Sequence, residues 1–153
     1  MIVYVDSSTL ARAYLVDEPG HAAAAALLVD PAIALVTGTW TRIEVSGALV
    51  RAARAGRQPT DAAPLLLALL DADLGPDGPV TVLTSEQTAI ETEALALVRA
   101  HGINAMDAWH LAVARLTLPQ LAEPGEELGF ATSDGPQRDV ARTIGFVAVP
   151  SVR

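Results

Sequence analysis

Four acidic side chains occupy positions where carboxylates could take part in metal chemistry. Asp6 and Asp134 each come just after a short run of β-forming residues, and Glu44 and Asp107 lie in the early turns of two segments with helical periodicity. Three of them also have a structural explanation as a helix N-cap or a partner of the helix dipole, and Glu44 could instead form a weak pair with Arg51 on a solvated face. Carboxylate oxygens suit Mg²⁺ or Mn²⁺ better than zinc. Because massed carboxylates repel one another without a cation, we predict that the four converge on a divalent metal and form the catalytic site.

Short apolar runs that alternate with longer helical segments must position these acids. This alternation predicts a three-layer α/β/α fold with a central, mostly parallel sheet of four to five strands. Ligands bind beyond the carboxyl ends of such strands, so Asp6 and Asp134 are expected at the same edge. The expected strands are Ile2–Val5, Ile33–Thr37, Val80–Leu83, Gly129–Thr132 and Phe146–Val149. The expected helices are about Ser8–Val16, His21–Val29, Thr41–Ala55, Asp61–Ala72, Glu86–His101, Ala105–Leu116 and Pro136–Thr143, with an acidic loop over Pro119–Leu128.

The composition limits the classes of protein that need to be considered. The 153 residues, about half of them hydrophobic, suit one domain over residues 1–153. The absence of cysteine excludes disulfides, zinc–thiolate sites and cysteine nucleophiles, and a cytoplasmic location is expected. The apolar stretches are shorter than the roughly 20 residues of a membrane helix, so no membrane association is expected.

The charge pattern bears on nucleic-acid binding. The net charge is −8 and every basic side chain is Arg, so a broad positive field for a polyanion is excluded. A metal and a local arginine cluster must then supply the positive charge. Arg51, Arg54 and Arg57 are spaced by three residues and are predicted to form an RNA-binding stripe on the helix that begins near Thr41. The alternative is three solvated arginines that balance nearby acids.

Three further polar residues are secondary candidates. Ser7 and Thr132 could bind a phosphate or a water at the metal, although both could equally be capping or strand-end hydroxyls. His110 lies three residues after Asp107 and could orient that carboxylate or contact RNA, with a buried, hydrogen-bonded histidine as the structural alternative.

The ordered set of motifs resembles the PIN-domain ribonucleases, and among them the VapC-type toxins of bacterial toxin–antitoxin pairs. The resemblance spans essentially the whole chain. It implies a metal-dependent endoribonuclease. Asp6 and Asp107 match the most constant metal ligands of the family, and Glu44 and Asp134 match the more variable members of its acidic cluster. It also implies homodimers and inhibition by a VapB-like antitoxin. The motifs are Val5-Asp6-Ser7-Ser8-Thr9-Leu10, Trp40-Thr41-Arg42-Ile43-Glu44-Val45, Ala105-Met106-Asp107-Ala108-Trp109-His110 and Phe130-Ala131-Thr132-Ser133-Asp134.

Other functions on a similar sheet fit less well. A receiver domain needs an acceptor Asp after a middle strand and normally a Lys, but Thr84 and Ser85 follow Val80–Leu83 and the chain has no Lys. A haloacid-dehalogenase-type phosphatase needs Asp-x-Asp, whereas two serines follow Asp6. The remaining alternative is a catalytically inactive PIN-like module that binds RNA or a partner.

Overall fold

The structure is a computed structural model that describes residues 1–59 and 61–149. Within these residues, five parallel strands form one sheet in the order β3-β2-β1-β4-β5. The strands are β1 (Ile2–Val5), β2 (Ala34–Gly38), β3 (Val80–Leu83), β4 (Leu128–Ala131) and β5 (Val147–Val149). The helices are α1 (Ser7–Tyr14), α2 (His21–Leu28), α3 (Trp40–Arg54), α4 (Ala62–Asp73), α5 (Gln87–His101), α6 (Ala105–Leu121) and α7 (Gly135–Thr143).

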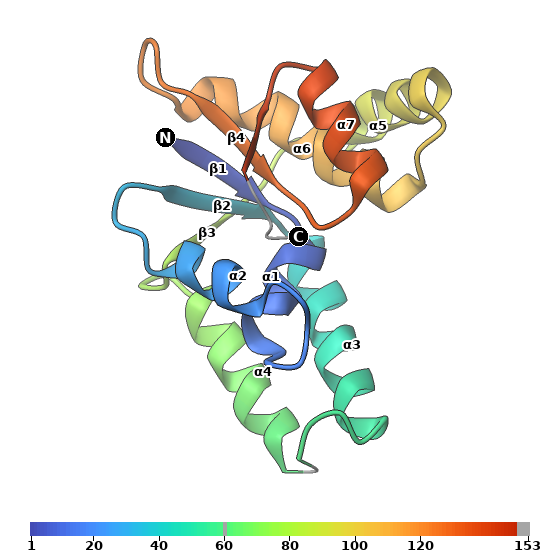
Figure 1. Cartoon of the computed structure of the whole chain (residues 1–153). Helices are drawn as coiled ribbons and strands as arrows, with labels where there is room; N and C mark the ends of the chain where they lie inside the picture. The colour runs from blue at the N-terminus through green and yellow to red at the C-terminus, as the bar shows by residue number, and fades with distance from the viewer. Residues whose placement is uncertain (60, 150–153) are drawn as a thin grey trace.

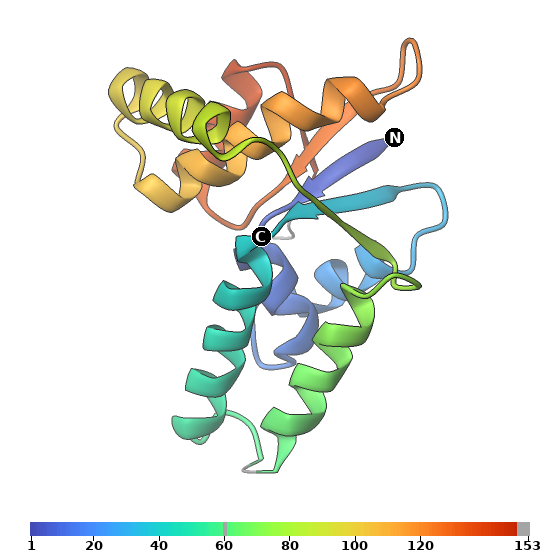
Figure 2. The same ribbon diagram turned by 180° about the vertical axis from the view of Figure 1, so that it is seen from behind.

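Helices cover both faces of the sheet. In Figures 1 and 2, α1–α4 lie on one face and α5–α7 on the other. Along β1, Ile2 and Tyr4 pack in the core beneath α5–α7, whereas Val3 and Val5 pack in the core on the side of α1–α4. Because alternate side chains of a strand point to opposite faces, a central strand covered on both sides is apolar throughout. The predicted three-layer α/β/α fold is confirmed.

The order of the strands places a crevice beside β1. The chain moves outward from β1 through β2 to β3, and then returns to β4 on the opposite side of β1. The backbone N–H of Asp6 donates to the carbonyl of Ala131 at 3.0 Å, so β1 and β4 stay together up to their carboxyl ends. Open parallel sheets bind ligands at such a switch in strand order. Asp6 and Asp134 follow the two strands that flank it.

The predicted acidic loop begins later than expected. Helix α6 continues through Pro119 to Leu121. A proline removes only one backbone hydrogen bond near a helix end, and the Gln120 side chain donates to the carbonyl of Leu116 at 2.6 Å. Gly135 and Pro136 form the first turn of α7, where the proline fits because a helix needs no N–H from its first residues.

Candidate functional site

The four predicted acids line one cleft at the carboxyl edge of the sheet. The cleft has a volume of about 430 Å³, and Ser8, Asn104 and Arg51 also line it. We call it the acidic cleft and define it by its four carboxylates, which come from four separate parts of the chain. These carboxylates are Asp6, Glu44, Asp107 and Asp134.

Asp6 is the most deeply buried of the four, with 3% of its surface exposed. It is the N-cap of α1, and its Oδ1 accepts a hydrogen bond from the backbone N–H of Thr9 at 2.9 Å. The Ser8 hydroxyl lies 2.9 Å from both carboxylate oxygens, and the Thr132 hydroxyl lies 3.0 Å from Oδ2. Burial raises the pKa of Asp6, while these donors act in the opposite direction. The capping role expected of an isolated Asp therefore coexists with a place in the cleft.

Asp134 caps α7 with one of its two carboxylate oxygens. Its Oδ1 accepts from the backbone N–H of Gln137 at 2.8 Å. The backbone N–H of Asp134 donates to the Thr132 hydroxyl at 3.0 Å, and this hydroxyl also lies 2.5 Å from Oε1 of Gln137. The Gln137 amide reaches the carbonyl of Asp107 at 3.3 Å. Gln137 is fully buried and thus links two of the acids.

Asp107 lies in the first turn of α6 and contacts Asn104, the N-cap of this helix. Asn104 accepts from the backbone N–H of Asp107 at 2.9 Å, and its side-chain amide donates to Oδ2 of the same residue. Burial and, after it, the charges of Asp134 and Asp6 raise the pKa of Asp107 to about 6. Repulsion between the carboxylates of the cleft therefore contributes to this raised pKa.

Glu44 is held by a histidine from another helix. Nε2 of His110 lies 2.6 Å from Oε2 of Glu44, and Nδ1 of His110 lies 2.8 Å from the Tyr4 hydroxyl. Burial alone would raise the pKa of Glu44, but the hydrogen bond with His110 outweighs it and the pKa is lowered overall, with a contribution from Ser7. His110 thus orients Glu44, whereas the sequence suggested Asp107 as its partner. The structure also places Ser7 beside Glu44, with its hydroxyl 3.5 Å from Nε2 of His110.

The structure does not place all three arginines of the predicted stripe on one helix. Helix α3 ends at Arg54, and Arg57 lies beyond that end. Arg57 forms ion pairs with Asp17 at 2.8 Å and Glu18 at 2.5 Å. Arg51 lines the acidic cleft and Arg54 is exposed on the same helix.

Two residues that hold the acids in place were not predicted from the sequence. Gln137 stands three residues after Asp134, and this Asp-x-x-Gln spacing is a recognisable capping signal. Ser8 has no local signal that distinguishes it from Ser7, because both follow Asp6. In the structure Ser8 donates to the carboxylate of Asp6, and Ser133 contacts Ser8 through both its backbone N–H and its hydroxyl.

The donor set suits a hard divalent cation. Oδ1 of Asp107 and Oδ2 of Asp134 accept no hydrogen bond from any residue that the structure describes. The raised pKa of Asp107 marks a place where a cation would relieve repulsion. However, over residues 1–59 and 61–149 no three His, Cys, Asp or Glu side chains stand close enough to hold one ion. The carboxylates would therefore have to move toward a bound metal.

Comparisons with known proteins agree with this architecture. Residues 3–118 match the PIN domain family. A 2.2 Å structure of VapBC-1 from nontypeable Haemophilus influenzae has a similar fold, with a TM-score of 0.56 and 18% sequence identity, and the match covers 99% of this chain and 98% of that one. No curated protein matches the sequence.

Proposed function

The chain belongs to the PIN domain family, and from this premise we propose that it is a divalent-metal-dependent endoribonuclease, the toxin of a VapBC-type pair. The observation that carries the proposal is the convergence of four carboxylates on one cleft, with mutual repulsion strong enough to help raise the pKa of Asp107 to about 6. A site that works without a cation would not need four carboxylates whose mutual repulsion costs free energy. One nuclease domain over residues 1–153 is part of the proposal.

The four acids of the cleft are the proposed ligands of Mg²⁺ or Mn²⁺. A bound ion supplies Lewis-acid activation of water and neutralises charge at the scissile phosphate. Asp107 and Asp134 offer oxygens that have no hydrogen-bond donor among the described residues. Asp6 is fixed by Ser8 and Thr132, and Glu44 by His110. These contacts restrict the carboxylates to rotamers that face the cleft, so less conformational entropy is lost when a cation and a phosphodiester bind.

The proposed partners are an RNA substrate, a second copy of the chain and a VapB-like antitoxin. The name VapBC-1 of the structural neighbour supports the antitoxin. Trp40 is 44% exposed and Ile43 is 66% exposed on α3, which supports a dimer contact on that face. Sedimentation measurements with Ile43→Glu test this, because a charge at the contact should shift the protein toward the monomer.

A cytoplasmic location is the proposed setting for this chemistry. Among the described residues, no helix has the length and apolar character needed to cross a membrane. The absence of cysteine from the sequence suits a reducing compartment, where disulfides do not form.

One observation favours a second candidate function. In the described part of the chain, no three potential ligands are close enough to hold an ion. A PIN-like module without catalysis, which binds RNA or a partner, would require no such group. Metal titration separates the two functions, because only the enzyme must bind Mg²⁺ or Mn²⁺ at the acidic cleft.

The deciding experiment is digestion of a mixed RNA substrate by the purified chain. We expect cleavage with millimolar Mg²⁺ or Mn²⁺, no cleavage with EDTA, and no cleavage by Asp107→Asn with metal. Arg99→Ala provides a matched control, since Arg99 is an exposed residue of α5 outside the cleft. Cleavage that persists in Asp107→Asn would remove the acidic cleft as the catalytic site. Absence of cleavage together with absence of metal binding would favour the inactive module.

A further inference from the structure

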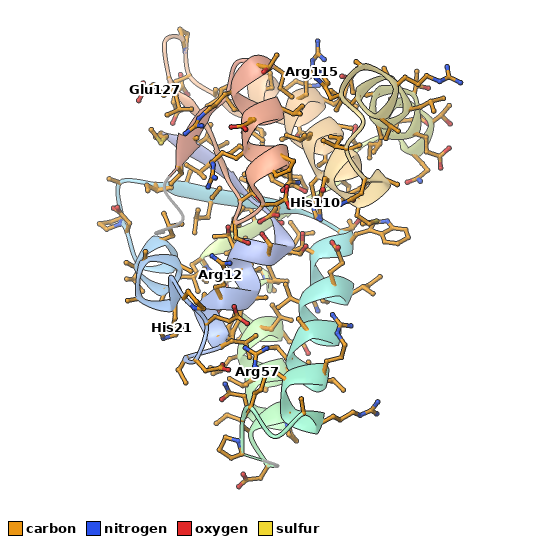
Figure 3. All side chains as sticks on the ribbon, turned by 45° about the vertical axis from the view of Figure 1, so that its right-hand side comes forward. Arg12, His21, Arg57, His110, Arg115 and Glu127 are labelled. Carbon is orange, nitrogen blue, oxygen red and sulfur yellow. The ribbon has the colours of Figure 1, made fainter. Side chains whose placement is uncertain are left out.

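A second groove joins the acidic cleft on the side of α1 and α3. It has a volume of about 420 Å³ and shares Ser8, Arg51 and Ser133 with the acidic cleft. Three arginines line it, and we call it the arginine groove, defined by Arg12, Arg51 and Arg57. In Figure 3, Arg12 lies between His110 of the site and Arg57.

Two of the three guanidinium groups have no acidic partner. Arg57 is committed to Asp17 and Glu18. Among the residues that the structure describes, Arg12 and Arg51 form no ion pair, although the chain carries 18 acidic residues against 10 basic ones. In so acidic a chain, two uncommitted arginines in one groove are a local concentration of positive charge.

The shape of the groove leaves room for a ligand beside these charges. Its floor includes the small side chains of Ala11 and Ala52 and the buried Leu15. A Cβ at Gly47 would come within 2.9 Å of Nη1 of Arg51, so glycine allows this guanidinium to lie along α3 toward the acidic cleft. The groove therefore offers an apolar surface with planar cations at its rim.

We propose that the arginine groove binds an RNA backbone phosphate next to the scissile one, through Arg12 and Arg51. The inference rests on the proposed endoribonuclease function. Guanidinium groups pair with phosphate oxygens through two parallel hydrogen bonds. The acidic cleft repels an RNA strand, so a phosphate held just outside it keeps the strand in register while the scissile phosphate enters. The floor formed by Ala11, Leu15 and Ala52 then contacts the sugar of the bound nucleotide.

RNA binding in EDTA tests the proposal without any need for cleavage. The test variant is Arg12→Ala with Arg51→Ala, and the matched control is Arg99→Ala with Arg115→Ala, which removes the same charge from exposed arginines outside both the arginine groove and the acidic cleft. The readout is fluorescence anisotropy of a short single-stranded RNA at several salt concentrations. We expect affinity about tenfold weaker in the test variant, and a slope of log affinity against log salt that is smaller in magnitude by about 0.7, the value for one phosphate contact on a single strand. The control should keep the wild-type slope.

A scan with methylphosphonates locates the phosphate. One uncharged linkage is placed at each position of the RNA in turn. In the wild-type protein one position should weaken binding, and in the test variant this position should lose its effect. Equal losses in test and control variants, or an unchanged slope in the test variant, would overturn the proposal. It would also be overturned if the test variant bound RNA normally and lost affinity only for an acidic protein partner. If RNA binding depended on the two arginines but the protein did not cleave RNA with metal present, the endoribonuclease function would be contradicted instead.

Discussion

His110 and Glu44 are 66 positions apart in the sequence, and their side chains are joined by a hydrogen bond of 2.6 Å between Nε2 and Oε2. The other ring nitrogen, Nδ1, lies 2.8 Å from the hydroxyl of Tyr4. Burial raises the pKa of Tyr4 well above its usual range, so this hydroxyl stays protonated, and we predict that it donates to Nδ1. The imidazole then carries its proton on Nε2 and donates it to Glu44. A fully buried tyrosine of β1 thereby sets the direction of a carboxylate on α3.

The first prediction concerns this chain of hydrogen bonds. Tyr4→Phe keeps the ring, which stacks on Phe130 with centroids 5.3 Å apart, and removes only the hydroxyl. We expect a loss of about 1 kcal/mol in stability, because Nδ1 of His110 is left buried without a donor. Metal affinity should fall severalfold as Glu44 loses its fixed orientation.

The tautomer of His110 provides the readout that a purely structural role would not change. ¹⁵N NMR should show the proton of a neutral imidazole on Nε2 in the wild-type protein, and exchange between tautomers in Tyr4→Phe. A proton on Nδ1 in the wild type would contradict the proposed direction of donation.

The second prediction separates catalysis from folding in two of the acids. Asp6→Asn and Asp107→Asn should each abolish cleavage, since an amide keeps the shape of the side chain but not its charge. In Asp6→Asn, Oδ1 can still accept from the backbone N–H of Thr9, and the new amide faces the Thr132 hydroxyl, which can accept a hydrogen bond from it. The free energy of unfolding without metal should therefore stay within about 1 kcal/mol of the wild type. Thermal unfolding with EDTA checks stability. Normal cleavage by either variant at millimolar Mg²⁺ is the contrary outcome.

The third prediction is a pH dependence that arises from Asp107. Its pKa is raised from 3.8 to about 6 in the folded protein, so the folded state binds the proton more tightly than the unfolded state. Stability without metal should therefore rise as the pH falls from 7 through 6, and the gain should be complete below 3.8. After allowance for solvent screening, the gain is about 1 kcal/mol. Metal affinity should fall over the same range, because protonation removes a ligand.

Urea unfolding of the wild type and Asp107→Asn between pH 7 and 5 measures this effect. The contribution of Glu44 has the opposite sign and falls outside that range, since the pKa of Glu44 is lowered below 4.5. The difference between the two proteins removes titrations that they share. Wild-type and variant curves that run parallel would show that Asp107 does not titrate in this range.

The fold and the placement of the acids follow from patterns that are local in the sequence. Asp6 and Asp134 end up at one edge because each follows a strand, and parallel strands must end on the same side. Asp107 is placed by the cap at Asn104, three residues away. Such features depend on a few neighbouring residues, and the ends of the helices and strands were predicted to within a residue or two, except for the end of α6.

The residues that were mistaken depend on contacts between distant parts of the chain. Arg57 fits the spacing of α3, but the helix ends at Arg54 and Arg57 turns to Asp17 and Glu18, about 40 positions earlier. The partner of His110 could not be read from its neighbours either, because Glu44 reaches it only when α3 and α6 pack at the same edge of the sheet. Side-chain partners across elements require the tertiary structure.

The last prediction concerns inhibition by a partner. The acidic cleft attracts cations whether or not a metal is bound, and an arginine can pair with two carboxylates through its planar fork. Asp107 and Asp134 present oxygens that have no donor among the described residues. We therefore expect a small antitoxin with a flexible segment that becomes ordered across the cleft and inserts one arginine there. The negative charge of the chain should speed their association at low salt.

Co-purification with the product of the neighbouring upstream gene, followed by mutation of its tail, tests this mechanism. Replacing the inserted arginine with alanine should restore cleavage while leaving a complex held by apolar contacts. Replacing a tail arginine that does not enter the cleft is the matched control and should preserve inhibition. Calorimetry provides an independent measure, because an arginine that pairs with Asp107 and Asp134 must compete with Mg²⁺ or Mn²⁺. An inhibitor that leaves metal binding unchanged would show that inhibition acts elsewhere on the protein, since two cations cannot share the same carboxylate oxygens at full affinity.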